Sequence, residues 1–224
     1  MGRKRSGRKG VLITFEGIEG SGKTTQLIRL AKLLREDGHR VVETREPGGT
    51  PFAERIRDLL LSPAVEPITP ECEAFLILAC RSQHVAHVIQ PALKEGAVVL
   101  CDRFSDSTLA YQGHARGLDV QLLRTLNRFA TSGLSPDLTL LFDVPVPLGL
   151  ARRRRHETEQ NRLDRESRGF HGQVRKGFLD LAAREPRRIR VVDGSADPET
   201  IAAEVAAIVR RFLQTRRKSK VRKS

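Results

Sequence analysis

The sequence predicts an α/β fold in which a five-stranded parallel sheet is flanked by helices on both faces. Short apolar runs that are typical of buried strands alternate with longer segments whose apolar residues recur at helical spacing. Alternating strands and helices give parallel sheets, because each helix returns the chain to the end where the next strand begins. The chain has 224 residues and no internal repeat or Pro/Gly/Ser-rich linker, which indicates a single domain.

The predicted strands are short apolar segments bounded by turn residues. Residues 11–15 read VLITF between Gly10 and Gly17, and residues 97–101 read AVVLC after Gly96. Runs this short, without polar alternation, fit strands that are buried on both faces. The full set of predicted strands is 11–15, 41–44, 97–101, 138–142 and 189–192.

The predicted helices begin at capping residues. Thr50-Pro51 and Thr69-Pro70 each place an N-cap threonine before a proline at the first helical position. After the glycine-rich turn that follows the first strand, apolar residues at helical spacing run up to Gly38, which ends the helix. The predicted helices are this first segment and then 51–61, 70–88, 91–95, 106–115, 120–132 and one that begins at 198.

Most of the net charge of +13 lies at the two ends of the chain. Residues 1–10 hold five basic residues and residues 215–224 hold six, and neither segment holds an acidic one. We expect both to be disordered basic tails that bind polyanions weakly, around a domain at residues 11–214. Inside the domain the basic surplus is confined to residues 151–190, so no specific nucleic-acid partner is expected.

The sequence offers neither a membrane span nor a disulfide framework. No apolar run approaches the roughly 18 residues that a membrane-spanning helix requires. The cysteines Cys72, Cys80 and Cys101 are odd in number, and reduced thiols are usual in the cytosol. We therefore expect a cytoplasmic protein that does not associate with membranes.

The most specific motif lies between the first strand and the helix that follows it. Residues 17–24 read GIEGSGKT and match the P-loop pattern G-x-x-x-x-G-K-[ST]. Glycines let backbone N–H groups approach phosphate oxygens, and the start of the helix adds partial positive charge. An ordinary glycine-rich turn is the alternative, which the strand before and the helix after disfavour. The residues expected to bind ATP are Gly17, Ile18, Glu19, Gly20, Ser21, Gly22, Lys23 and Thr24, with Lys23 at the β- and γ-phosphates.

A second signal is an acid at the end of the third strand. Asp102-Arg103 follows the apolar run at the sheet edge where α/β proteins bind ligands. We expect Asp102 and the hydroxyl of Thr24 to hold Mg²⁺, and Arg103 to bind a phosphate. A helix-capping aspartate beside a surface arginine is the alternative, which the P-loop disfavours.

The third signal is a dense group of arginines. Residues 152–155 are all arginine, and Arg162 and Arg165 follow. We expect a mobile lid at about 151–166, because an arginine on a transferring phosphoryl group accelerates transfer about 10³- to 10⁵-fold. Consecutive residues point in different directions around a helix, so one or two at most face the site. A solvated basic face or a nucleic-acid patch is the alternative.

Together these motifs resemble the bacterial thymidylate kinases, a family of P-loop nucleoside monophosphate kinases. The resemblance runs from about Leu12 to Phe212. It rests on the P-loop, TREPGGT at 44–50, Glu73 and Arg81, DR at 102–103, STLAYQG at 107–113, PDLT at 136–139 and RLDR at 162–165.

The resemblance implies phosphoryl transfer from ATP to dTMP, giving dTDP, with Mg²⁺, by a cytosolic homodimer. One arrangement in the family has a basic residue in the P-loop, and the other supplies arginines from the lid. Glu19 and the arginine-rich lid resemble the second. The implied substrate-binding residues are Glu46, Pro47, Arg57, Ile77, Arg81, Arg103, Thr108, Tyr111 and Gln112, and the implied catalytic residues are Lys23, Glu19, Arg103, Arg152 and Arg154.

One position departs from the family pattern. Related enzymes usually place a phenylalanine that stacks on thymine four residues before the substrate-binding arginine, and this chain has Ile77 before Arg81. The lost stacking amounts to about 0.5–1.5 kcal/mol. A P-loop kinase for another nucleotide or nucleoside is therefore an alternative, and a nucleic-acid-associated P-loop protein is a more remote one.

Overall fold

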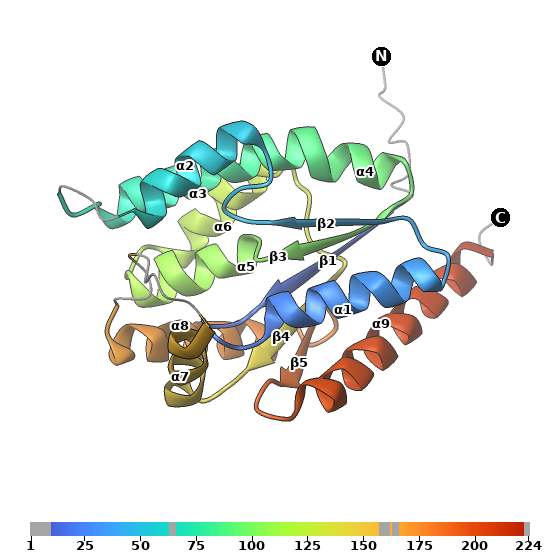
Figure 1. The fold of residues 1–224 in the computed structure, drawn as a ribbon. Helices are drawn as coiled ribbons and strands as arrows, with labels where there is room; N and C mark the ends of the chain where they lie inside the picture. The colour runs from blue at the N-terminus through green and yellow to red at the C-terminus, as the bar shows by residue number, and fades with distance from the viewer. Residues whose placement is uncertain (1–9, 63–65, 157–161, 163–165, 222–224) are drawn as a thin grey trace, which may run out of the picture.

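The computed structural model describes residues 10–62, 66–156, 162 and 166–221 (Figure 1). These residues form the predicted α/β fold, in which every strand pair is parallel. The strand order in the sheet is β2-β3-β1-β4-β5. The strands are β1 (Val11–Glu16), β2 (Val41–Arg45), β3 (Val98–Asp102), β4 (Leu138–Asp143) and β5 (Ile189–Asp193).

The order of the strands positions the site. Strand β1 lies at the centre, between β3 and β4, so the chain leaves it toward one side of the sheet and later returns to the other. Ligands of open α/β sheets bind where this reversal opens a crevice at the carboxyl ends of the strands. Phe15 pairs with Asp102 and Arg45 pairs with Asp102, which aligns the ends of β1, β2 and β3 at one edge.

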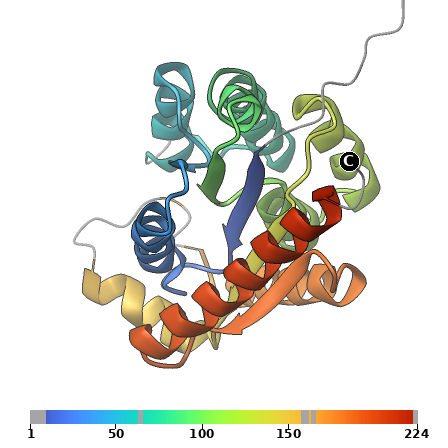
Figure 2. The same cartoon turned by 90° about the vertical axis from the view of Figure 1, so that its right-hand side faces the viewer.

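Two helices that are far apart in the sequence cover one face of the sheet. Helix α1 (Lys23–Glu36) packs against α9 (Pro198–Val221), and Figure 2 shows α9 crossing the front of the sheet. Leu27 and Leu30 of α1 share a buried cluster with Ile201 of α9 and with the central strands. This cluster fixes the start of α1, where the phosphate loop ends.

The other face carries a larger set of helices. The segments α3, η1 and α4 follow one another without a break and pack beside β3, while η2 and α8 pack together over β4 and β5. The bounds are α2 (Pro51–Leu61), α3 (Pro70–His84), the π-helix η1 (Val85–Ile89), α4 (Gln90–Lys94), α5 (Ser105–Thr108), the π-helix η2 (Leu109–Ala115), α6 (Val120–Ala130), α7 (Val146–His156) and α8 (Arg168–Arg184).

The capping residues act as the sequence predicts. Thr50 accepts a hydrogen bond from the Ala53 backbone at 3.1 Å, and Thr69 accepts one from the Cys72 backbone at 3.2 Å. The predicted break between residues 88 and 91 is wrong, because Pro91 sits at the start of α4, where the chain is already helical. Within the described part of the chain, no helix is both long and apolar enough to cross a membrane.

Helices α7 and α8 are absent from the prediction, although α8 carries a clear signal. Phe170, Val174 and Phe178 recur every four residues and are buried, and the Ser167 hydroxyl caps the helix by accepting from Phe170 N. The many charges nearby obscured this apolar stripe. Its consequence for the site is large, because α8 packs against η2, which carries Tyr111 and Gln112.

The expected tail boundaries also need correction where the structure describes them. Helix α9 continues to Val221, past the expected start of a disordered tail at residue 215. Arg216 is part of the folded body, because its Nη1 donates to Asp137 at 2.7 Å. At the other end, Gly10 is buried and its N–H donates to Leu93 O. Residues 1–9 and 222–224, and residues 157–161 and 163–165 of the expected lid, lie outside the described residues.

Candidate active site

A cavity of about 920 Å³ opens at the carboxyl ends of the central strands. The P-loop after β1, the segment after β2 and the turn after β3 all line it, as the predicted position of the site requires. Gly17, Ile18 and Arg154 are not among its lining residues. The predicted site residues that line it are Glu19, Gly20, Ser21, Gly22, Lys23, Thr24, Glu46, Pro47, Arg57, Ile77, Arg81, Asp102, Arg103, Thr108, Tyr111, Gln112 and Arg152.

The P-loop is packed tightly against helix α7. Gly20 has a φ of 69°, and a Cβ built on it would lie 1.9 Å from the carbonyl oxygen of Gly149. A Cβ on Gly149 would in turn lie 2.7 Å from the carbonyl oxygen of Glu19. Glycine at both positions therefore lets the two backbones touch.

Lys23 is the first residue of α1 and is nearly buried. Its Nζ donates to the backbone carbonyl of Ile18 at 3.1 Å, which folds the side chain along the loop. Burial and the nearby charge of Arg103 lower the pKa of Lys23 to about 8. An ammonium held in this way is best stabilised by an anion, which is what a nucleotide phosphate brings.

Glu19 gathers partners from three other elements. Its Oε1 accepts from Arg103 Nη2 at 2.8 Å and from the Tyr111 hydroxyl at 2.7 Å. His171 Nδ1 lies 3.2 Å from Oε2, although the two atoms are not aligned for a hydrogen bond. Burial alone would raise the pKa of Glu19, but the charges of Arg103 and Lys23 and the hydrogen bond from Tyr111 hold it well below its usual range. Glu19 is therefore a buried carboxylate that keeps its charge.

Arg103 adopts an uncommon backbone conformation. Its φ of 68° is left-handed, a region that residues other than glycine rarely occupy and that clusters at functional sites. Its N–H donates to Phe15 O at 2.9 Å, and the next residue, Phe104, donates its N–H to Glu16 at 2.8 Å. These bonds fix the turn and direct the Arg103 guanidinium over the Tyr111 ring, 4.9 Å from its centroid.

Asp102 and Thr24 meet as the sequence predicts. The Thr24 hydroxyl donates to one carboxylate oxygen of Asp102. The other oxygen, Oδ1, is buried and accepts no hydrogen bond from the described residues. A buried carboxylate oxygen without a partner is costly unless it serves a ligand, and oxygen is the ligand that Mg²⁺ prefers.

Arg81 on α3 is the most heavily bonded side chain at the far end of the cavity. Its Nε donates to Glu46 at 2.7 Å, Nη1 donates to Thr108 at 2.7 Å and to Asn127, and Nη2 donates to Phe104 O at 3.0 Å. A guanidinium has five N–H groups, so these four bonds leave one Nη2 donor for a ligand. The side chain is 1% exposed, so its position is fixed before any ligand binds.

Gln112 offers an acceptor in the same cavity. Its Nε2 donates to Glu73 at 2.8 Å, which assigns the amide orientation because a carboxylate only accepts. Its Oε1 is then buried without a partner among the described residues, while Gln112 itself lines the cavity. Burial would raise the pKa of Glu73, but Gln112, Arg162 and Arg116 lower it.

Ile77 takes the position that an aromatic ring fills in related enzymes. It lines the cavity one turn before Arg81 on α3. Phe75 is 61% exposed and Phe104 is fully buried, and neither lines the cavity, so neither replaces the missing ring. Nearby, Arg57 Nη1 donates to Pro47 O at 2.7 Å.

The expectation that one or two at most of the four consecutive arginines face the site is wrong, because three of them line the cavity. Arg152, Arg153 and Arg155 line the cavity and Arg154 does not, although Arg154 and Arg155 are both exposed. Arg152 Nη1 donates to Gly194 O at 2.6 Å. The structure therefore does not bring Arg154 to the site.

Comparison with known proteins identifies the family. The profile described as Thymidylate kinase matches residues 15–205. A thymidylate kinase from Geobacter sulfurreducens is 54% identical over 205 residues, which cover 89% of this chain and 96% of that protein. One from Pseudomonas putida is 49% identical over 203 residues, covering 89% and 95%. The chain belongs to the thymidylate kinase family. Its reaction is the phosphorylation of dTMP to dTDP.

A solved thymidylate kinase structure agrees with the observed architecture. The enzyme from Ehrlichia chaffeensis superposes with a TM-score of 0.73 and 35% sequence identity, over 90% of this chain and 98% of that one. The predicted fold and the predicted enzyme class of this thymidylate kinase are both confirmed.

Some side chains at the site of this thymidylate kinase were missed by the sequence analysis. Glu16 holds the Arg103 turn, Glu73 orients Gln112, and His171 lies on Glu19. Burial and the charge of Asp106 raise the pKa of Glu16 to about 8. The apolar stripe of α8 could have placed His171 on a buried helix. Glu16 could have been found from its position directly before the P-loop.

Proposed function

We propose that ATP binds with its phosphates in the P-loop and that dTMP binds between α3 and η2 in the same cavity. The observation that carries this proposal is the Glu19–Arg103 ion pair, which joins the phosphate loop to the cluster around Arg81. The phosphate of dTMP then lies near Arg57 and Arg103. Glu19 lies between the two substrates and orients Arg103 and Tyr111.

The base is selected by one donor and one acceptor. Arg81 offers its remaining N–H, and Gln112 offers its unpartnered Oε1. Thymine carries an acceptor at O4 and a donor at N3, whereas cytosine carries a donor at N4 and an acceptor at N3. A cytosine base would therefore leave buried polar groups unpaired, which costs about 1–3 kcal/mol for each group. Thr108 takes part through Arg81, to which its hydroxyl is bonded.

Mg²⁺ is held by the hydroxyl of Thr24 and the carboxylate of Asp102. The unpartnered Oδ1 of Asp102 and the adjacent hydroxyl form an oxygen donor set that suits this hard cation. When bound, the cation neutralises charge on the ATP phosphates. The protein's own contribution is to hold the two oxygen groups together at the start of α1 and the end of β3.

The lid supplies the arginines for phosphoryl transfer. Position 19 of the P-loop is an acid, so the charge that develops on the phosphoryl group needs cations from elsewhere. Arg152, Arg153 and Arg155 support this role because they line the cavity. Arg154, which does not line the cavity, is not proposed to act.

The protein forms a homodimer through helices α2, α3 and α6. Helix α3 packs between the other two, and all three carry large apolar side chains that are unusually exposed. A second copy of the chain is the occupant we propose, and sedimentation of a Phe75→Glu, Phe129→Glu variant tests it. The exposed side chains are Phe52, Leu59, Phe75, Leu122 and Phe129.

The unpaired thiols of the chain support a cytoplasmic location.

The decisive experiment is an ADP-release assay with matched acceptors. We expect dTMP to be the best acceptor, dUMP to follow because it keeps O4 and N3–H, and dCMP, dGMP and thymidine to react at least about 10²-fold more slowly in kcat/KM. An Arg81→Lys variant keeps the positive charge and loses the fork of donors, so its KM for dTMP rises. A dCMP rate equal to that for dTMP would overturn the proposed base contacts.

A further inference from the structure

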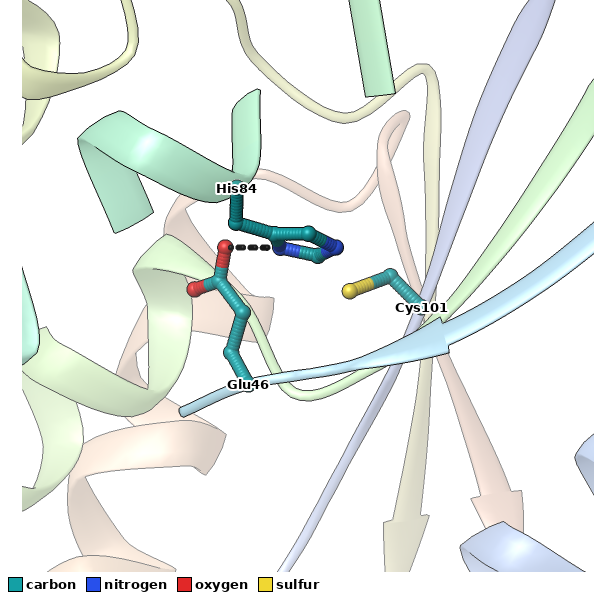
Figure 3. A group of neighbouring side chains, drawn as sticks. All are labelled: Glu46, His84 and Cys101. Atoms are coloured by element: carbon teal, nitrogen blue, oxygen red, sulfur yellow. Dashed lines mark hydrogen bonds and ion pairs between the residues drawn. The ribbon is translucent and has the colours of Figure 1, made fainter. Parts of the chain in front are cut away.

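A buried polar cluster lies behind Arg81, and of its three members only Glu46 also lines the cavity. It consists of Glu46 after β2, His84 at the end of α3 and Cys101 in β3, and Figure 3 shows the three side chains converging. All three are buried, and His84 is completely excluded from solvent. The His84 imidazole has a hydrogen-bonding partner at each ring nitrogen, and none of the roles proposed above uses it.

Two hydrogen bonds orient the His84 ring. Nδ1 lies 3.0 Å from Glu46 Oε1, and because a carboxylate only accepts, Nδ1 carries the proton. Nε2 lies 2.6 Å from the Thr44 hydroxyl, within hydrogen-bonding distance. A Cβ on Gly49 would lie 2.5 Å from the ring, so the backbone there clamps its face. The ring is therefore held in one orientation.

Glu46 transmits this orientation to Arg81. One carboxylate oxygen accepts from His84 and the other accepts from Arg81 Nε at 2.7 Å. Arg81 and His84 are three residues apart on α3, which places both on the same side of the helix, toward Glu46. Thr44, His84, Glu46 and Arg81 thus form one chain of hydrogen bonds that ends at the base-binding donor.

The same three side chains have the ligand types of a zinc site, but the bonding argues against one. Both nitrogens of His84 and both oxygens of Glu46 already have protein partners. Burial raises the pKa of the Cys101 thiol well above its usual value, and this thiol donates to Arg103 O at 3.1 Å. Both nitrogens of the His84 ring are therefore engaged, and the thiol keeps the proton that a metal ligand would lose.

We propose that His84 is a positioning residue for dTMP binding, which holds Glu46 so that Arg81 presents its remaining N–H to the base. The inference rests on the proposed base contacts of Arg81. Loss of the Nδ1 donor frees Glu46 to turn, and Arg81 then loses the partner that fixes its Nε. The effect falls on dTMP and not on ATP, whose loop is on the other side of the Glu19–Arg103 pair.

Two variants separate positioning from simple packing. In His84→Asn the amide nitrogen takes the place of Nδ1 and keeps the bond to Glu46. In His84→Gln the amide reaches the place of Nε2 and keeps only the bond to Thr44. We expect His84→Gln to raise the Kd of dTMP, measured by calorimetry, at least about tenfold, while His84→Asn stays within about threefold of wild type. The KM for ATP stays within about twofold in both.

A double-mutant cycle with Glu46→Gln tests whether His84 acts through Glu46. We expect the combined loss in dTMP affinity to be smaller than the product of the single losses. If His84→Gln does not fold, Thr44→Val tests the chain of bonds from its other end, and we expect its dTMP Kd to rise at least about threefold. Arg81→Lys serves as the reference for direct base contact.

The outcomes are distinct. Equal weakening by His84→Asn and His84→Gln, parallel changes in the KM values of dTMP and ATP, or independent effects of His84 and Glu46 would each overturn the positioning role. Stoichiometric zinc in the purified enzyme would overturn it in favour of a metal site. An unchanged dTMP Kd in Arg81→Lys would instead overturn the proposed base contacts on which the inference rests.

Discussion

Arg188 and Asp106 form a two-pronged ion pair, with distances of 2.6 and 2.9 Å, behind the turn that carries Arg103. The charge of Asp106 is thereby kept next to Glu16, which holds the same turn through Phe104 N and the Ser107 hydroxyl. Burial and this negative charge raise the pKa of Glu16 to about 8. The support of this arginine therefore contains a carboxyl group whose pKa lies well above that of an ordinary glutamate.

The first prediction concerns this acid. Its folded-state pKa is above the usual 4.5, so its contribution to stability is complete below about pH 4.5 and is lost as the pH rises through about 8. The wild-type protein should lose unfolding free energy between about pH 5 and pH 8. We expect Glu16→Gln, which resembles the protonated form, to lose at least about 1 kcal/mol less over the same range. Urea unfolding at both pH values measures it. Identical pH slopes in wild type and variant would contradict the prediction.

The second prediction concerns Lys23. Removing its charge from the phosphate loop deprives the transferring phosphates of a stabilising group, which is typically worth about 2.7–4 kcal/mol. We expect Lys23→Ala to fold normally and to lose at least about 10²-fold in kcat/KM. Lys32→Ala, an exposed change on the same helix, is the matched control. Activity close to wild type in a folded Lys23→Ala protein would remove Lys23 from the donor site.

The third prediction concerns Ile77. Because Ile77 lines the cavity and neither nearby phenylalanine does, Ile77→Phe should supply a ring for the base. We expect KM for dTMP to fall about 2- to 10-fold with kcat nearly unchanged, since stacking stabilises the ground state and the transition state alike. Ile77→Leu, which adds no ring, should leave KM as it is. A higher KM in Ile77→Phe would show that the pocket has no space for the ring.

The fourth prediction concerns the arginines of α7. A lid arginine acts on developing charge, so its loss should lower kcat with little change in KM for dTMP. We expect at least one of Arg152→Ala, Arg153→Ala and Arg155→Ala to cost about 1.5 kcal/mol or more in activation free energy. Arg154→Ala is the control and should cost under about 0.5 kcal/mol, as exposed substitutions do. Uniformly small effects, or a large effect at Arg154, would contradict the proposed lid.

Local motifs made much of this molecule predictable. The P-loop, the acid after β3 and the threonine caps each have their chemistry within a few consecutive residues, and the structure has Thr24 and Asp102 in contact as expected. The alternation of strands and helices was enough to predict a parallel sheet of five strands. Its order places β1 in the centre.

The unpredicted residues depend on partners that are distant in sequence. His84 acquires its role from Thr44 and Glu46, which are 40 and 38 residues away. Glu73 acquires its role from Gln112, 39 residues away. Histidine and glutamate in a helix carry no local mark of such pairing. The choice among the four arginines of α7 likewise depended on the helical phase, which a run of identical residues conceals.

The contact between Gly20 and Gly149 makes the phosphate loop and the first turns of α7 one mechanical unit. The two backbones are in direct contact there, and no side chain lies between them that could rotate and change their spacing. The arginines that follow Gly149 therefore start from a point fixed on the P-loop, and their reach is set by distance along the helix. The start of α7 therefore has no freedom to shift relative to the P-loop. Even one added methyl group at either glycine would displace the helix and its arginines.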